Sequence, residues 1–387
     1  MRFPSCFPKK LASPPNEFFC EILFMNPDKA NSISRLKRLL PRFRKIHIGV
    51  LGDLMLDRYL WGTANRLSPE AAVPVVDFVS QSECLGGAGN VASNLAALGA
   101  HVEAFGVIGG KHRGGKVIDD EPGSGLRACL HASKIGDRGI LADTHRVTTV
   151  KTRVIARHQQ IVRIDHERRD PLARETEEKL FRLFVASLKK LDALVISDYD
   201  KGVINDTFAD RVLHACHKYK VPVFVKPKTS RLYAYRGARV IVCNAKEASF
   251  YVTRALSSEK SVEEAGRALL PHFGCAAVVI TRGEKGISVF EEVSPRHLHI
   301  PATSFEVTYA RVGQPGVERG STGRQVFDVT GAGDTVLSVV SLAVAAGAPL
   351  PTAAFLANAA AGVVVGKLGT ASVSPAELAA ALDDNQP

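Results

Sequence analysis

The sequence predicts an α/β fold with a mainly parallel central sheet, helices flanking that sheet, and a second, smaller β-sheet beside it. From residue 46 onward, short apolar runs rich in Val and Ile alternate with amphipathic stretches such as 174–191. Continuous apolar strands separated by helices are typical of a parallel sheet that is buried on both faces. The clearest of these runs are 46–51, 193–197, 221–225, 240–243 and 276–281.

Other segments have a different pattern. Residues 74–80 and 148–165 alternate β-branched and polar side chains, so strands there expose one face. We therefore expect lid strands near 60–80 and 148–165 that form the smaller sheet. Residues 109–118 and 303–323 contain several glycines and no convincing periodicity, and we expect both to be exposed, mobile loop insertions.

Composition and charge exclude several classes of protein. The chain has 387 residues, of which 45% are hydrophobic and 23% charged, so it is neither disordered nor fibrous. Its net charge of +11 is concentrated in residues 1–45, which hold ten basic and three acidic side chains. We expect a basic, flexible leader there and one domain over 46–387. No zinc-finger, RRM or arginine-rich helix pattern is present, so we expect no nucleic-acid partner; the alternative is salt-sensitive binding by the leader.

Cysteine usage and hydropathy bear on location. Seven scattered cysteines, none spaced as C-x-x-C, indicate a reduced, cytoplasmic protein without a zinc site. The apolar stretch at 18–25 is short and contains Glu21, unlike the core of a signal peptide. No apolar run approaches the ~18 residues that span a bilayer, so we expect no membrane partner.

The segment DVTGAGDT at 328–335 carries the clearest chemical signal. A strand, a glycine-rich turn and a helix start form an anion-binding site, in which Gly331, Ala332 and Gly333 let backbone N–H groups approach a phosphoryl group. Asp334, in the first helical turn, can accept a proton from an attacking hydroxyl. The alternative is that Asp334 only caps the helix and the glycines only turn the chain.

This turn resembles the C-terminal signature of the ribokinase-like (PfkB) carbohydrate kinases. Further segments are similar to one branch of that family, the bacterial D-glycero-β-D-manno-heptose 7-phosphate kinases. They are GDLMLDRY at 52–59, RLSPEAAVPVV at 66–76, GGAGNVA at 86–92, TVKTRVIAR at 149–157 and GKLGTA at 366–371. The resemblance extends from about residue 46 to 382 and implies a ribokinase-like three-layer fold.

The resemblance also implies an activity. The γ-phosphoryl group of ATP would pass to the anomeric hydroxyl of the heptose 7-phosphate, giving the 1,7-bisphosphate used for ADP-heptose and lipopolysaccharide. ATP would be bound with Mg²⁺, and a monovalent cation is compatible with the family. The lid would also mediate a homodimer. Because the chain has no H-x-G-H segment, we expect a separate adenylyltransferase to act downstream.

On the nucleotide side, the family's N-x-x-E motif falls on Asn244, Ala245, Lys246 and Glu247, where Glu247 would help to order hydrated Mg²⁺. Asn244 follows an apolar strand, at the edge where open α/β sheets bind ligands. The alternative is a helix cap with an exposed partner.

Two more nucleotide contacts are expected. Thr281 and Gly283 lie in a segment that resembles the family's nucleotide-side loop, although a tight hairpin explains that segment nearly as well. Asn358 would face the adenine, and a solvated helix position is the simpler alternative.

For the sugar, we expect contacts from Gly87 and Asn90, which open a helix, and from Asp53 and Asp57, which follow the first strand. A carboxylate can accept two neighbouring sugar hydroxyls, and an amide can both donate and accept. A helix cap is the alternative for Asp53.

Three cations of the lid, Lys151, Arg153 and Arg157, could share one strand face and point toward the 7-phosphate, and Arg163 lies in the same lid. A solvated strand face is the alternative.

The chain departs from the family pattern at two places that bear on activity. Residues 109–118 interrupt the match before the acidic pair Asp119 and Asp120, and Lys226 stands where the family typically has Asp. A cation at 226 could add a phosphate contact or displace metal. Two alternative functions remain open: another sugar or nucleoside kinase of the family, and a catalytically silent regulator that binds nucleotide or sugar.

Overall fold

A computed structural model describes residues 29–157, 159–228, 234–295, 297–302, 331–367 and 371–384. Its centre is a ten-stranded sheet in the order β14-β13-β12-β11-β10-β9-β1-β4-β5, with β6 paired to β4. The strands are β1 (His47–Gly52), β4 (His101–Arg113), β5 (Lys116–Asp119), β6 (Gly136–Asp143), β9 (Ala193–Ser197), β10 (Val223–Lys226), β11 (Val240–Asn244), β12 (Ala277–Thr281), β13 (Ile287–Glu291) and β14 (Leu298–Ile300). Across the sheet, the neighbouring strands in the order β6-β4-β1-β9-β10-β11-β12 pair in parallel. Strands β5, β13 and β14 pair antiparallel at the edges.

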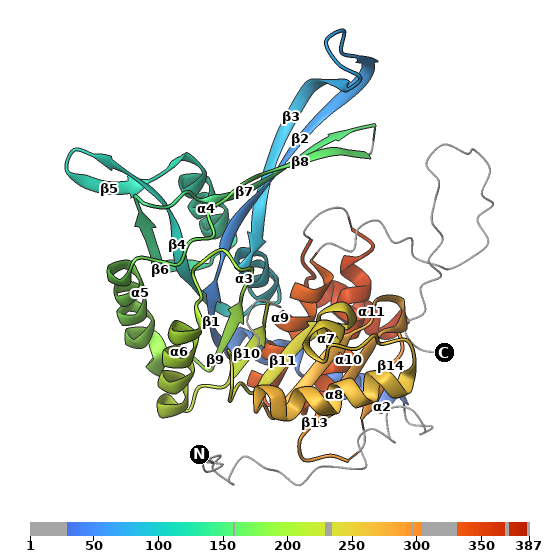
Figure 1. The fold of residues 1–387 in the computed structure, drawn as a ribbon. Coiled ribbons are helices and arrows are strands. Elements are labelled where there is room, and N and C mark those ends of the chain that lie inside the picture. Colours follow the sequence, from blue (N-terminus) through green and yellow to red (C-terminus); the bar gives the residue numbers. More distant parts are fainter. Residues whose placement is uncertain are drawn as a thin grey trace.

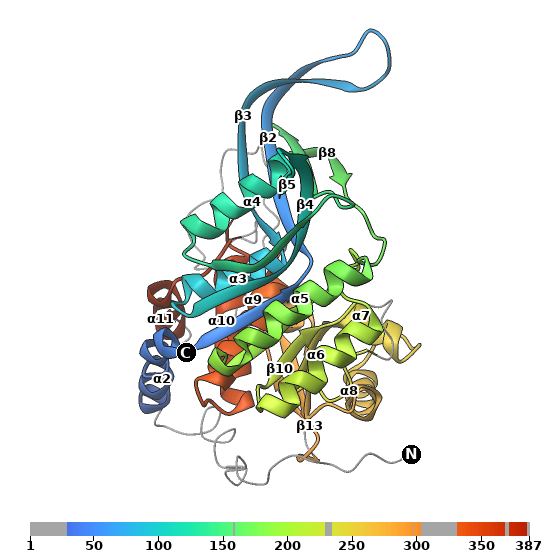
Figure 2. The ribbon, with the colours of Figure 1, turned by 90° about the vertical axis from the view of Figure 1, so that its left-hand side faces the viewer.

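Helices cover both faces of this sheet and give the three layers that the sequence predicts (Figures 1 and 2). Alternate strand residues face opposite cores, as Val50 and Leu51 of β1 do. One core contains α3 (Ala88–Ala97), α4 (Glu121–Ala132), α9 (Ala332–Ala345), α10 (Leu350–Val364) and α11 (Pro375–Asp384). The other contains α5 (Arg174–Ser187), α6 (Asp206–Tyr219), α7 (Ala245–Tyr251) and α8 (Glu259–Phe273), with the short 3-10 helices η3 (Leu188–Lys190) and η4 (Gly283–Lys285) between elements.

A separate four-stranded sheet forms the lid. Its order is β3-β2-β7-β8, with β2 (Leu54–Leu67), β3 (Pro74–Gly87), β7 (Thr149–Ala156) and β8 (Gln159–His166). In Figures 1 and 2 these strands project away from the layered body, and the β2–β3 hairpin extends furthest. The alternation in the sequence therefore correctly predicts a second sheet with an exposed face.

Two expectations differ from the structure. The leader was expected to be flexible through residue 45, but α2 (Lys29–Lys37) and η2 (Leu40–Lys45) are formed, and Leu36 and Phe43 are buried in the core. Lys37 also forms an ion pair of 2.6 Å with Asp383 of α11. Burial of these apolar side chains is what holds the segment against the domain.

Residues 109–118, expected as a mobile loop, belong instead to a β-hairpin. Strands β4 and β5 pair antiparallel through Arg113 and Lys116, and Gly114 and Gly115 between them both have positive φ, at 56° and 73°. A two-residue turn of this kind requires left-handed backbone, which glycine adopts without strain. The other expected insertion, 303–323, lies outside the described residues. Within the described ranges, none of the helices is long and apolar enough to cross a membrane.

Candidate active site

The N-terminus of α9 places Asp334 at the centre of the site. Gly331 caps the helix with φ of 84°, a left-handed conformation that suits glycine, and Ala332 and Gly333 complete the turn. The N–H of Asp334 donates to the carbonyl of Gly331 at 2.9 Å, and the carboxylate side chain is only 4% exposed. The expected turn and helix start are therefore present, with the carboxylate pointing into the protein.

Three elements supply hydrogen bonds to this carboxylate. Asn90 of α3 donates to Oδ2 at 2.9 Å, Tyr199 after β9 donates its hydroxyl to both oxygens at 2.8 and 2.9 Å, and Lys226 of β10 donates to Oδ1 at 2.7 Å. All three residues are at least 108 positions away from Asp334 in the chain. The single hydroxyl proton of Tyr199 is shared between the two oxygens, while Asn90 and Lys226 each bind one oxygen, so both oxygens of the carboxylate are engaged.

The charges of this cluster reinforce one another. Burial alone would lower the pKa of Lys226, but the negative charge of Asp334 and the hydrogen bond to it more than reverse this effect and raise the pKa. Burial and the charge of Asp334 raise the pKa of Tyr199. Lys226 therefore stays an ammonium, and Tyr199 stays a neutral hydroxyl donor.

Asn90 is itself oriented by Asn94, one turn later in α3. The amide of Asn94 donates to the carbonyl of Asn90 at 2.9 Å and to Oδ1 of Asn90 at 3.2 Å. Thr335 of α9 donates its hydroxyl to Oδ1 of Asn94 at 3.1 Å. These buried bonds tie α3 to α9, and they fix the amide that donates to Asp334.

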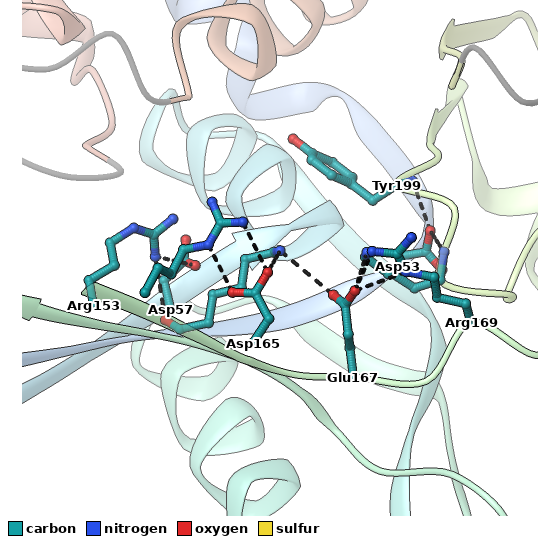
Figure 3. A network of polar contacts seen from close by, with 10 residues as sticks. Asp53, Asp57, Arg153, Asp165, Glu167, Arg169 and Tyr199 are labelled. Carbon is teal, nitrogen blue, oxygen red and sulfur yellow. Dashed lines mark hydrogen bonds and ion pairs between the residues drawn. The ribbon is translucent and has the colours of Figure 1, made fainter.

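Asp53 supports the loop that carries Tyr199 (Figure 3). Its buried carboxylate accepts the backbone N–H groups of Tyr199, Lys201 and Val203 at 2.8, 3.1 and 3.3 Å. Burial and the nearby charge of Asp198 raise the pKa of Asp53 to about 6, against the lowering effect of those N–H groups. The sugar contact expected of Asp53 stays a prediction, and the structure adds this positioning role.

On the lid, Asp57 of β2 accepts a hydrogen bond from Nη1 of Arg153 of β7 at 2.7 Å, and Figure 3 shows the two side chains facing one another. The Asp57 side chain is buried, at 5% exposure, and that of Arg153 is partly buried, at 12%. The Arg153 guanidinium also lies over the Tyr59 ring, 5.4 Å from its centroid. Gly87 opens α3 with φ of 55°, and a Cβ there would come within 2.5 Å of the Asp53 carbonyl oxygen.

Two further cations of the lid, Lys151 and Arg163, are paired with carboxylates. Lys151 lies 3.2 Å from Asp165 and 3.7 Å from Glu167, and Arg163 also pairs with Asp165. In the sheet register Lys151 stands opposite Asp57 and Arg153 opposite Tyr59, so both lie on the same face.

Arg157 is not brought to that face with the other two. It follows the last residue of β7, has φ of 50°, and donates to Asn65 at 2.7 Å. We expected the alternation of β7 to align Arg157 with Lys151 and Arg153, but the strand ends at Ala156.

On the nucleotide side, Asn244 and Glu247 form a capping box at the start of α7. Oδ1 of Asn244 accepts the N–H of Glu247 at 2.8 Å, and Oε2 of Glu247 accepts the N–H of Asn244 at 2.9 Å. Ala245 and Lys246 form the first turn between them. Mg²⁺ in kinases commonly keeps several waters and takes its other ligands from phosphates and one or two carboxylates, so the chemistry of Glu247 fits a role beside the ion.

Thr281 pairs with Asn244 across β11 and β12, which places both at the carboxyl edge of the sheet. Gly283 lies in the hairpin turn to β13, so the hairpin alternative describes this loop. Asn358 is buried and donates to the carbonyl of Pro301 at 2.9 Å, which rules out a solvated helix position. Nucleotide contacts by these residues stay predictions.

The residues of the site gather at one edge. Asp53, Tyr199, Lys226, Asn244 and Thr281 all lie at or just beyond the carboxyl ends of parallel strands. Ligands of open α/β sheets bind at this edge. The site residues that sequence reasoning missed are Tyr199 and Asn94. The polar run SDYDKG directly after strand 193–197 was the available signal for Tyr199.

The chain has a three-layer α/β body with a separate small sheet, and a buried carboxylate lies in the first turn of a helix after a glycine turn. Together these features define a phosphotransferase of the ribokinase-like fold. The sequence profile described as pfkB family carbohydrate kinase matches residues 45–377, and the chain belongs to this family. It is therefore a carbohydrate kinase, with ATP as co-substrate.

Comparisons with individual proteins agree. The chain is 42% identical over 352 residues to the "Bifunctional protein HldE" of Geotalea uraniireducens and 44% identical over 333 residues to that of Geobacter sulfurreducens. These matches cover 91% and 86% of this chain but 66% and 62% of the relatives, so the chain spans a little under two thirds of their length.

Solved structures show the same fold at low identity. Arabidopsis thaliana ribokinase complexed with ribose and ATP matches with a TM-score of 0.63 and 16% identity, covering 87% of this chain and 98% of that one. Phosphofructokinase-2 from Escherichia coli, in complex with substrates and products, matches with a TM-score of 0.67 and 18% identity, covering 88% and 99%.

Proposed function

We propose that this chain phosphorylates D-glycero-β-D-manno-heptose 7-phosphate at its anomeric hydroxyl, with ATP and Mg²⁺, to give the 1,7-bisphosphate. The HldE relatives, at 42% and 44% identity, and the lid motifs that resemble heptose 7-phosphate kinases support this substrate. The observation that carries the reaction type is the buried Asp334 carboxylate, which Asn90 and Tyr199 orient at the start of α9.

Asp334 is the general base in this proposal. It accepts the proton of the anomeric hydroxyl as the oxygen attacks the γ-phosphorus, and the backbone N–H groups at Gly331, Ala332 and Gly333 bind the transferring phosphoryl group. Asn90 and Tyr199 hold the carboxylate in one orientation. Glu247 orders the hydrated Mg²⁺, which neutralises charge on the ATP phosphates.

The lid recognises the sugar phosphate. Lys151 and Arg153 lie on one strand face beside Asp57, and each is paired with a carboxylate. A phosphate dianion entering this face competes with those carboxylates for the two cations, while Asp57 accepts sugar hydroxyls. In this proposal the carboxylate partners neutralise the two cations until the phosphate of the substrate displaces them.

A second copy of the chain covers the lid in this proposal. β8 is the edge strand of the small sheet, all of its residues are exposed, and Val162 and Ile164 are 47% and 56% exposed. Exposed apolar side chains on an edge strand favour pairing with another chain. Analytical ultracentrifugation of the wild type and of Val162→Glu/Ile164→Lys tests the dimer, which the double variant should dissociate.

The test of the activity is Mg·ATP-dependent ADP release with heptose 7-phosphate, compared with fructose 6-phosphate, ribose and no sugar. Asp334→Asn should lower kcat by several orders of magnitude with little change in ATP binding, because it keeps the shape of the side chain and removes the base. Turnover with fructose 6-phosphate or ribose instead would assign another sugar kinase activity. We place the reaction in the cytoplasm, where ATP is available.

One observation favours a second candidate, a silent regulator that binds ligand without turnover. Lys226 occupies one oxygen of the carboxylate that would have to act as base, at 2.7 Å. ATP binding without phosphorylation of any sugar would support this alternative.

A further inference from the structure

We propose that Lys226 is the cation that binds the γ-phosphoryl group of ATP, and that it leaves Asp334 to do so, which releases the base only when ATP is bound. This inference rests on the proposed role of Asp334 as general base. In this inference the ion pair opens when ATP binds, and the regulator alternative corresponds to an ion pair that never opens.

The position of Lys226 places its ammonium beside the turn that would bind phosphate. Lys226 is the last residue of β10, at the carboxyl edge of the sheet. A Cβ on Gly333 would lie 3.3 Å from Nζ and 3.6 Å from Cε of Lys226, so the ammonium packs directly against the first turn of α9. Gly333 leaves room for this approach, and a larger residue would press on the ammonium.

The ammonium also lies on the more open side of the ion pair. The Lys226 side chain is 20% exposed, whereas the Asp334 side chain is 4% exposed. A ligand entering from solvent therefore meets the cation before the carboxylate. Phosphate is the anion that a carbohydrate kinase brings to this place, and a γ-phosphoryl group carries more negative charge than one carboxylate.

The pair has to open for the reaction to proceed. The ammonium of Lys226 lies 2.7 Å from Oδ1, one of the two oxygens that could receive the proton of the sugar hydroxyl. Oδ1 of Asp334 accepts from both Lys226 and Tyr199, and Oδ2 accepts from Asn90 and Tyr199. A sugar hydroxyl must come within hydrogen-bonding distance of one oxygen, and Lys226 occupies Oδ1 from the more exposed side of the pair. Lys226 is the only one of these three donors that carries a charge for which a phosphoryl group competes.

The transfer of the phosphoryl group forms one bond to phosphorus and breaks another. The anomeric oxygen forms a bond to the γ-phosphorus, the bond from that phosphorus to the β,γ-bridging oxygen breaks, and ADP leaves with the electron pair. The proton of the hydroxyl passes to Asp334. Lys226 keeps its protons and donates hydrogen bonds to oxygens of the transferring group, where negative charge is redistributed in the transition state.

The test compares how the full-length chain binds Mg·AMPPNP, an ATP analogue with an intact triphosphate, and Mg·ADP, by titration calorimetry. Lys226→Met should reduce the preference for the triphosphate by about 10- to 100-fold, the loss expected for one hydrogen bond to a charged group. ADP affinity should stay within about threefold, which also shows that the site is folded. Lys226→Gln serves the same purpose if the Met variant does not fold.

Lys228→Met is the matched control. Lys228 lies two residues further along the same segment, and its Nζ is 5.4 Å from the centroid of the Tyr199 ring, the same distance as Nζ of Lys226. Among the described residues, Lys228 has no hydrogen bond to Asp334. Its variant should keep the triphosphate preference within about twofold. If Lys228→Met lost as much triphosphate preference as Lys226→Met, the preference would depend only on the general positive charge near the site, and the proposal would be overturned.

The double variant Lys226→Met/Asp334→Asn separates direct contact from mere neutralisation of Asp334. If Lys226 binds the phosphoryl group, its removal should still cost about tenfold or more in triphosphate preference relative to Asp334→Asn alone. If the loss vanishes in that background, Lys226 only neutralises the carboxylate and the inference fails. These binding results stand whether or not the chain turns over heptose 7-phosphate, so failure of the proposed function is recognised separately, in the ADP-release assay.

Discussion

Replacing Gly86 with alanine disturbs the sugar side of the site through one contact. A Cβ at this position would lie 2.8 Å from Oδ2 and 2.9 Å from Cγ of Asp57, where ordinary contacts begin at 3.4 Å. Asp57 is buried and hydrogen-bonded to Arg153 at 2.7 Å. The carboxylate must therefore move by roughly 0.6 Å, the shortfall between these contact distances, and the movement displaces it from its position in the lid.

The size of the effect follows from that bond. A hydrogen bond between charged groups contributes about 1.5–3 kcal/mol, and a displaced Asp57 loses part of this bond and its alignment with the sugar hydroxyls. We expect the KM for heptose 7-phosphate to rise about 10- to 100-fold in Gly86→Ala, with the KM for ATP changed less than twofold. Steady-state kinetics with each substrate varied in turn measures both values.

Gly125→Ala, in helix α4, is the matched control, because a Cβ there would lie 3.1 Å from the carboxylate end of the Glu83 side chain and at an ordinary contact distance of 3.7 Å from Cδ2 of Leu56. It should leave both KM values unchanged. A wild-type KM for the sugar phosphate in Gly86→Ala would refute the assignment of Asp57 to sugar binding, and an equal rise in both KM values would indicate a general disturbance of the fold.

Three further predictions concern the base, its support and the N-terminal segment. Tyr199→Phe removes the hydroxyl bonded to both Asp334 oxygens, so kcat should fall at least about tenfold with ATP affinity retained; an unchanged kcat would exclude Tyr199 from positioning the base. Folding raises the pKa of Asp53 from 3.8 to about 6, so the folded protein keeps a proton on this carboxyl over a pH range in which the unfolded chain has lost it. The stabilisation from Asp53 is therefore fully present below pH 3.8 and is lost as the pH rises through 6. In urea unfolding, the free energy of unfolding of the wild type should therefore fall by about 3 kcal/mol over that pH range relative to that of Asp53→Asn. Parallel plots of this free energy against pH for the two proteins would contradict the raised pKa. Phe43→Ala should destabilise the fold by about 3–5 kcal/mol in the same assay, because Phe43 is fully buried, whereas a flexible leader would show no change.

Much of the fold could be predicted from local patterns. A strand buried on both faces needs an uninterrupted apolar run, and the runs at 193–197 and 240–243 correspond to β9 and β11. The alternation at 148–165 indicated β7 and β8, which lie in the projecting lid, where all residues of β8 are exposed. The N-terminal boundary was missed because α2 and η2 are held by packing of Leu36 and Phe43, respectively, against the domain, which composition does not record.

Parts of the site could also be predicted from short sequence segments. The turn and helix start around Asp334, and the capping box of Asn244 and Glu247, each involve residues within four positions of one another. Backbone geometry of this kind depends on residue type in a short window, so a motif can specify it. The hairpin after Thr281 belongs to the same class.

By itself, the sequence determined the layered parallel sheet, the second sheet, and an acidic residue at a phosphate-binding helix start. The surroundings of that residue are set by contacts between elements that are distant in the chain. Lys226, Tyr199 and Asn90 reach Asp334 across 108, 135 and 244 residues of chain, from three elements that meet at one sheet edge. The same packing turns Asp53 toward the Tyr199 loop. Such contacts depend on strand order and side-chain packing rather than on neighbours in sequence, and the burial that packing creates is what gives the charges their strength.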